Sequence, residues 1–457
     1  MLRYLAALCL PALLTAQIDI GSRRELFVDH FLIERLSNTS LRLQSPVEKE
    51  TVLKLDRPWE GAFSGYFTVI KDGPRYVLYY RCLPVSGADG RAEESTCRAE
   101  SSDGIHFTRP ENNVILKQKP PFSHNFAPFL DRNPHAAPTE RFKALAGTSK
   151  SGLAAFASPD GINWKKMRED PVLPPSKETR YDSQNVAFWS EHEKQYVCYF
   201  RTFKNNVRWV SRTTSPDFRT WAPPVEMSFG DAPAEHIYVN QTSPYFRAPH
   251  IYMSLAARFM PGRQVLTAEE AAAIRVDPKY FQDCSDAVFF TTRGGDRFDR
   301  TFLESFLRPG QGMENWVSRS NYPANTVVET GPAEISFYVN RNYGQPTAHL
   351  KRYALRTDGF VSVHAGYQPG ELLTKPLKFQ GKRLEINYST SAAGSIRIEV
   401  QDASGKVLEE SREIIGDQID RTVAWKSGGD LAGVQGTPVR LRVILRDADL
   451  YSIRFRD

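Results

Sequence analysis

The sequence predicts an all-β protein, in which a five-bladed β-propeller is followed by a C-terminal β-sandwich. A turn with the pattern Ser-x-Asp-Gly-x-x-aromatic recurs along the chain, and strand-like segments fall into groups between its copies. After residue 366 the turn stops recurring, and short segments alternate strictly between apolar and polar residues. With 12% aromatic residues, 29 glycines and 30 prolines, the composition is typical of a turn-rich β protein.

The recurring turn sets the period of the propeller. Asp103, Asp160 and Asp217 follow one another at intervals of 57 residues, and Asp-Gly supplies the positive φ that a tight turn needs. Five copies of the turn predict five blades of four strands, and a β-sandwich of regular hairpins is the competing architecture. The copies, the last two weaker, lie at residues 101–107, 158–164, 215–221, 293–298 and 356–360.

The predicted strands follow in chain order. The fourth unit is longer than the others, which indicates an insertion with a helix over residues 268–274. The propeller strands are expected at 66–70, 76–82 and 96–101; 126–130, 142–146 and 152–157; 186–189, 196–201 and 207–213; 244–247, 250–256 and 287–291; and 335–340, 350–355 and 360–363. The sandwich strands are expected at 383–387, 395–400, 439–444 and 452–455.

Three parts of the chain are expected. A chain of 457 residues is too long for one core, because single cores stop growing at roughly 250–300 residues. Residues 1–16 resemble a secretory signal peptide, which predicts export to the periplasm or the exterior. Their apolar run is shorter than the ~20 residues of a membrane span, so no membrane span is predicted. The propeller, with strand-rich lead-in residues, is assigned to 17–366 and the sandwich to 367–457.

Cysteine and charge patterns exclude several classes of site and partner. Cys82 ends one predicted strand and Cys97 lies in the next, so a disulfide across this hairpin and two buried thiols are the alternatives. No cysteine pair has the spacing of a zinc site. The net charge of +6 is spread along the chain without a basic run, so no nucleic-acid partner is predicted. The sequence leaves the oligomeric state open.

Polar residues precede the innermost predicted strand of each blade. Innermost strands line the central channel of a propeller, so the residues before them should meet at one mouth. Buried carboxylates cost desolvation energy unless they are paired, so this concentration of acids predicts a functional site. The candidates are Trp59, Glu60, His124, Asn125, Tyr181, Asp182, Asn185, Glu235, His236, Tyr238, Glu329 and Glu334.

A second set of candidates consists of arginines near the ends of second strands, which return to the same mouth. These are Arg81, Arg201, Arg258 and Arg341. The arginine fork matches the oxygens of carboxylate, sulfate and phosphate groups, which predicts an acidic or sulfated sugar as ligand. The alternative is that these arginines neutralise carboxylates of the channel.

The five-blade layout, the aspartate turns, the mouth carboxylates and the trailing sandwich together resemble the five-bladed glycoside hydrolases of families 32, 43, 62 and 68. Over residues 55–365 the chain is similar to an uncharacterised bacterial branch related to family 32. The resemblance implies Glu60 as nucleophile or base, Asp182 as the residue that orients the sugar, and Glu235 as general acid, with Glu329 or Glu334 as alternatives for the acid. The chain departs from the family motifs, since Arg180-Tyr-Asp182 stands where the family has Arg-Asp-Pro.

Three functions are therefore compared. The first is an exported glycosidase that cleaves a poly- or oligosaccharide with two carboxyl groups, and Trp59, Tyr181 and Tyr238 are its sugar-stacking candidates. The second is a non-catalytic carbohydrate-binding propeller, and the third is a platform for protein partners. No cofactor is required. Calcium is an alternative occupant, because Asp182, Asn185 and Glu235 carry the hard oxygen ligands that it takes.

Overall fold

The computed structural model describes residues 17–86, 90–119, 121–177 and 179–457. The predicted signal peptide lies outside these residues. The regular structure of the described chain is mostly strand, and none of its helices is long and apolar enough to cross a membrane. Two compact units are present, one formed by Leu43–Phe360 and the other by the described residues up to Arg42 together with Val361–Asp457.

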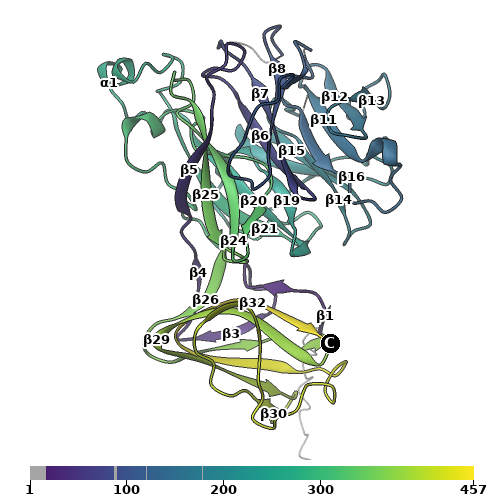
Figure 1. Ribbon diagram of the computed structural model, residues 1–457, viewed down its shortest axis with the longest axis vertical. Helices are drawn as coiled ribbons and strands as arrows, with labels where there is room; N and C mark the ends of the chain where they lie inside the picture. Colours follow the sequence, from purple (N-terminus) through teal and green to yellow (C-terminus); the bar gives the residue numbers. More distant parts are fainter. Residues whose placement is uncertain (1–16, 87–89, 120, 178) are drawn as a thin grey trace, which may run out of the picture. The chain divides into compact units, whose positions relative to one another are not determined.

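Residues 43–360 form the predicted five-bladed propeller (Figure 1). In each of the first three blades, four consecutive strands pair in an antiparallel sheet. Blade I has β6 (Gly65–Asp72), β7 (Arg75–Cys82), β8 (Ser95–Ser101) and β9 (Val114–Leu116). Blade II has β10 (Ala127–Leu130), β11 (Phe142–Thr148), β12 (Gly152–Ser158) and β13 (Lys165–Lys166), and blade III has β14 (Val186–Ser190), β15 (Gln195–Lys204), β16 (Val207–Ser215) and β17 (Val225–Glu226).

Blade IV has an inner strand in two pieces, β18 (His236–Val239) and β19 (Thr242–Tyr245). Both pair with β20 (Ala248–Met260), and the chain between them turns at Gln241, whose φ is 48°. The predicted insertion lies between β20 and β21 (Cys284–Thr292). It contains α1 (Ala268–Ala273), which begins at a capping box formed by Thr267 and Glu270.

Blade V is completed by a strand from the start of the propeller. Its inner segments are β22 (Tyr322–Pro323) and β23 (Val328–Gly331), followed by β24 (Glu334–Arg341) and β25 (His349–Arg356). The outermost strand is β5 (Val47–Lys54), which Figure 1 shows beside β25. Since β5 and β25 come from the two ends of the unit, their pairing closes the ring and covers the edge of β25.

The recurring aspartate turns are structural. Asp160 Oδ1 accepts backbone hydrogen bonds from Ile162 and Asn163, each 2.8 Å long, and Gly161 has a φ of 74°. The hydroxyl of Tyr79 in blade I donates to the carbonyl oxygen of Gly161 over 2.9 Å. Trp164 packs against the ring of Tyr79 and fixes the same contact between blades I and II. The turn therefore holds adjacent blades together.

The lead-in strands predicted for the propeller belong instead to the C-terminal unit. β1 (Ile18–Gly21) pairs with β28 (Leu377–Phe379), and β3 (Ile33–Ser37) pairs with β27 (Gly370–Thr374). Each lead-in strand has only a few residues, so the partner more than 300 residues away decides where it lies. The remaining strands of this unit are β2 (Glu25–Leu26), β4 (Ser40–Leu43), β26 (Val361–Ala365), β29 (Arg383–Gln401), β30 (Val407–Glu410), β31 (Asp417–Thr422) and β32 (Arg440–Arg456).

The C-terminal unit consists of a nine-stranded sheet and the two-stranded sheet of β1 and β28. Four predicted strands merge into two long ones, since 383–387 and 395–400 both lie in β29, and 439–444 and 452–455 both lie in β32. Side chains from both sheets, including Ile20, Phe379 and Ile398, share one buried apolar cluster. Alternation along the strands thus located the core-facing residues.

Candidate functional site

A pocket lies where the inner strands of blades I, IV and V begin. It lies at the end of the strands where the mouth of the channel was predicted. We use the word mouth for this pocket together with the cluster around Tyr238, which contacts Arg319 of the pocket wall. Its wall includes Tyr66 at the start of β6, Arg81 near the end of β7, and Arg319 from the segment before β22. Tyr66 and Arg319 have positive φ values of 55° and 61°, so the chain turns sharply at both residues.

Four arginines surround the tyrosines of the mouth. The guanidinium carbons of Arg201, Arg208 and Arg319 lie 4.8, 5.1 and 5.5 Å from the centre of the Tyr238 ring. The guanidinium of Arg81 lies 4.6 Å from the centre of the Tyr66 ring. Cations over aromatic faces are stabilised by the ring quadrupole, so arginines and tyrosines support each other here.

Most of this positive charge has no carboxylate partner. Among the described residues, Arg201 forms an ion pair with Asp182, whereas Arg81, Arg208 and Arg319 have no carboxylate within 4.0 Å. Arg201 is buried, and its Nε and Nη1 atoms have no hydrogen-bond partner in the described chain. Buried donors without acceptors are costly, and an anionic ligand would satisfy them.

The charges of the mouth act on Tyr238. Burial raises the pKa of this phenol, but the nearby guanidiniums of Arg319, Arg201 and Arg208 outweigh burial and hold the pKa below its usual value. The neighbouring Tyr322, whose ring centre lies 5.1 Å away, has a pKa raised well above the usual value because burial dominates. The arginines therefore favour the phenolate of Tyr238.

Several predicted mouth residues hold the loop that carries Asp182. His124 Nε2 lies 2.9 Å from the backbone oxygen of Asp182, and its Nδ1 lies 2.8 Å from Glu94 Oε1. The side-chain amides of Asn125 and Asn185 both donate to the carbonyl oxygens of residues 181 and 183. These bonds hold the backbone of the loop, and the Asp182 side chain, which is 26% exposed, pairs with Arg201.

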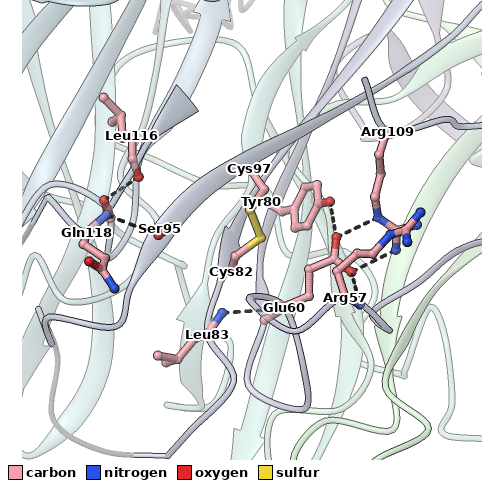
Figure 2. Close-up of a disulfide and its surroundings, with 12 residues drawn as sticks. Arg57, Glu60, Tyr80, Cys82, Leu83, Ser95, Cys97, Arg109, Leu116 and Gln118 are labelled. Carbon is pink, nitrogen blue, oxygen red and sulfur yellow. Dashed lines mark hydrogen bonds and ion pairs between the residues drawn. A yellow bond between two sulfur atoms is a disulfide. The ribbon is translucent and has the colours of Figure 1, made fainter. Parts of the chain in front are cut away.

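Glu60, predicted as the nucleophile or base, does not reach the mouth. Figure 2 shows its carboxylate between Tyr80 and Arg109. The Tyr80 hydroxyl donates to Oε1 over 2.7 Å, and Arg109 donates to both carboxylate oxygens over 2.7 and 2.8 Å. Glu60 is completely buried, and it is not among the residues that line the pocket. Alternate residues of β7 face opposite sides of the blade, which separates the Tyr80 network from Arg81.

Glu235, predicted as the general acid, is paired with two arginines. Arg258 and Arg300 donate to its two oxygens over 2.6 and 2.7 Å. Burial raises the pKa of Glu235, but the two arginines outweigh burial and lower the pKa below its usual value. A general acid needs a raised pKa, so this environment does not suit the predicted role.

The remaining predicted residues divide between structural and mouth positions. Glu329 pairs with Lys71 at the far end of β6, and Glu334 pairs with Arg352, so neither lies at the mouth. Arg258 binds Glu235 and Asp286, and Arg341 donates to Asn321 and to the carbonyl oxygen of Pro309.

The ring-bearing candidates also differ in their surroundings. Tyr181 is buried against Phe200, and burial raises its pKa to about 12, so it is a core residue. Trp59 is 41% exposed, and His236 Nδ1 lies 3.3 Å from Arg208.

The calcium alternative finds no support in the contacts. Asp182 and Glu235 are bound to different arginines, so these two carboxylates do not converge on one ion. Within the described ranges, no three His, Cys, Asp or Glu side chains are grouped as a metal site requires.

Two mouth arginines were not predicted. Arg208 is the second residue of β16, the third strand of its blade, which starts at the mouth because it runs antiparallel to the second. Extending the strand-end rule to third strands would have found it. Arg319 lies in an irregular segment before β22, where no periodicity gives a signal.

No family model and no curated protein matches the sequence. Solved structures with similar folds include a family 32 β-fructofuranosidase from Bombyx mori, with 11% identity, a TM-score of 0.45, and coverage of 89% of this chain and 94% of that one. A family 43 arabinoxylan arabinofuranohydrolase from Bacillus subtilis, solved with cellotetraose, has 11% identity, a TM-score of 0.42, and coverage of 89% and 99%. An N-acetylgalactosamine deacetylase from F. plautii has 12% identity, a TM-score of 0.47, and coverage of 71% and 96%. These similarities assign no residue of the site.

Proposed function

We propose that this chain is an exported carbohydrate-active protein that binds an acidic saccharide at the mouth and acts on its glycosidic bonds. The observation that carries the proposal is the grouping of Arg81, Arg201, Arg208 and Arg319 around Tyr66 and Tyr238, with Asp182 as their one ion-pair partner among the described residues. Guanidinium groups recognise carboxylate and sulfate, and aromatic rings pack against sugar faces.

The proposal rests on this arginine mouth and not on a pair of carboxylates. The three predicted catalytic acids belong to separate networks, since Glu60 binds Arg109, Glu235 binds Arg258 and Arg300, and Asp182 binds Arg201. Asp182 is the predicted acid that remains in contact with the mouth. The disulfide between Cys82 and Cys97 supports export, because disulfides persist in oxidising compartments.

The experiment that tests this proposal compares matched oligosaccharides that are neutral, uronate-containing or sulfated. Isothermal titration calorimetry at two salt concentrations should show binding of the acidic members, weaker at high salt, and little binding of the neutral ones. Arg319→Ala should weaken acidic binding at least 10-fold, because a charged hydrogen bond contributes about 1.5–3 kcal/mol.

Arg132→Ala is the matched control. Arg132 is exposed and borders a cavity with Leu130 and Glu191, where inner strands end and not where they begin. Its loss should leave acidic binding within twofold of the unsubstituted protein. Equal affinity for neutral and acidic saccharides would contradict the proposal. Binding without turnover of any saccharide would favour the non-catalytic carbohydrate-binding alternative.

A further inference from the structure

Tyr238 differs from every other described tyrosine whose pKa is shifted. Burial raises the pKa of the others, such as Tyr199 and Tyr252, above the usual value. Tyr238 is only 6% exposed, yet its pKa is lowered because three guanidiniums lie within 5.5 Å of its ring centre. A buried phenol that is held toward the phenolate is suited to accept a proton.

The groups that face Tyr238 come from several elements. Arg201 is on β15, Arg208 is on β16, Arg319 precedes β22, and Asp182 acts on Tyr238 as an opposing negative charge. On the other sides the ring packs against Phe259 and Tyr322, with ring centres 5.6 and 5.1 Å away. The polar part of its surroundings is therefore cationic, with Asp182 paired to Arg201.

Neutralising a carboxylate is the main requirement for removing a proton from the adjacent carbon. In a uronate residue, the C5 hydrogen lies next to the C6 carboxylate, and the carbanion that forms on its removal places negative charge on that carboxylate. Guanidiniums that bind the carboxylate stabilise this charge. Arg208 and Arg319 have no carboxylate partner in the described chain, and Arg201 has two buried nitrogens without acceptors, so all three can serve.

We propose that the mouth cleaves the acidic saccharide by β-elimination at a uronate residue, with Tyr238 as the base and Arg201, Arg208 and Arg319 as the groups that neutralise the uronate carboxylate. This inference rests on the proposed function and names its substrate class and reaction. The three arginines surround the ring of one tyrosine, Tyr238. Of the three predicted catalytic carboxylates, Asp182 pairs with one of these arginines, whereas Glu60 and Glu235 pair with arginines outside this cluster.

The reaction is balanced without water or any other reactant. The Tyr238 phenolate oxygen takes the C5 hydrogen as a proton. The electron pair of the C5–H bond forms a double bond between C4 and C5, and the C4–O4 bond breaks with both electrons on O4. The phenol then returns its proton to O4, which becomes the hydroxyl of the released saccharide and leaves Tyr238 as phenolate.

The test incubates the full chain with polygalacturonate, alginate, a glucuronan and chondroitin sulfate in water enriched in oxygen-18. Elimination predicts new reducing ends that appear together with the ultraviolet absorbance of the unsaturated uronate. Mass spectrometry should show the unsaturated product without the labelled oxygen. Hydrolysis would give saturated products carrying oxygen-18, which would overturn the inference and leave the proposed function standing.

Substitution of Tyr238 distinguishes a role as catalytic base from a role in packing alone. Tyr238→Phe keeps the ring and should lower kcat at least 100-fold, as expected for loss of a general base, with saccharide binding retained. Tyr199→Phe is the control, because Tyr199 is buried in blade III, where its ring packs against Phe188 and Phe298. It should retain full activity.

The remaining outcomes are equally decisive. Unchanged turnover in a folded Tyr238→Phe protein would refute the role of Tyr238 as base. Binding of these uronates without cleavage would overturn elimination while acidic recognition stands. Failure to bind any acidic saccharide would reject the proposed function itself.

Discussion

At the scale of single residues, the charges that surround a side chain decide its role more than the residue type does. Glu60, Asp182 and Glu235 were grouped by sequence position, yet arginines from different elements bind each of them. The two arginines on Glu235 stabilise its ionised form, whereas a general acid must stay protonated. The arginines around Tyr238 likewise favour its phenolate, which makes a tyrosine the candidate base of the mouth.

The lowered pKa of Tyr238 predicts the pH dependence of cleavage. The phenolate is the active form, so kcat should rise with pH through the pKa of Tyr238, and the inflection should lie below the usual tyrosine value of 10.0. Arg319→Ala removes the largest of the three cationic effects and should move this inflection to higher pH. The measurement is a pH–rate profile of both proteins, and an unmoved inflection would contradict the assignment.

At the scale of secondary-structure elements, turns and hairpins fix the blades on which the mouth is built. The Tyr79 hydroxyl of blade I donates a hydrogen bond to the carbonyl oxygen of Gly161 in a turn of blade II, and this contact joins the two blades. The disulfide between Cys82 and Cys97 joins β7 to β8, which is one of the two alternatives that the sequence left open (Figure 2). Both features lie near the strand that carries Arg81, so we expect them to support its position.

Two glycines with similar backbone angles should respond differently to alanine. A Cβ atom at Gly161 would lie 2.4 Å from the Tyr79 hydroxyl, whereas at Gly262 nothing lies within 4 Å. Both have positive φ, of 74° and 71°, so both variants carry the strain of alanine in that region, about 1 kcal/mol. Gly161→Ala adds an overpacking cost of about 1–3 kcal/mol. Urea denaturation should show the difference, and equal midpoints would refute the contact.

Removal of the disulfide should lower the stability of the propeller. The bridge closes a loop with a sequence separation of 15 residues, and a loop of that size contributes about 3 kcal/mol by the chain-entropy model. The Cys82→Ser, Cys97→Ser double variant should therefore unfold at lower urea concentration, and reduction of the unsubstituted protein should have the same effect. The double variant is its own control, because the other described cysteines, Cys198 and Cys284, are free thiols, and reducing agent should therefore not lower its stability further.

At the scale of the whole molecule, closure of the ring depends on a strand that is remote in sequence. β5 pairs with β25, and Leu53 lies opposite Leu350 in this pairing. Both side chains are buried in one cluster with Tyr80 and Tyr338. The ends of the propeller are therefore joined through the same core that packs blade I against blade V.

Leu53→Ala should destabilise the closed ring as a unit. Loss of a buried leucine side chain costs about 2–5 kcal/mol, and the cost should appear in the unfolding of all five blades because β5 closes the ring. The measurement is hydrogen exchange of β25 and of blade III, followed separately. Faster exchange confined to β25 would contradict a cooperative closure. Val47→Ala is the control, since Val47 is 57% exposed on the same strand.

The amino-acid sequence by itself determined the blade period and the insertion in blade IV, and it placed Arg81, Asp182, Arg201 and Tyr238 among the residues expected at one mouth. It left a disulfide between Cys82 and Cys97 and two buried thiols as alternatives. These features follow from local patterns, because turn residues and strand alternation act over a few neighbouring positions. Only the tertiary structure decided that β1 and β3 join the C-terminal unit and that Glu60 and Glu235 leave the mouth. Short strands and ionised side chains take whichever distant partner the fold places beside them, and one sequence does not reveal those partners.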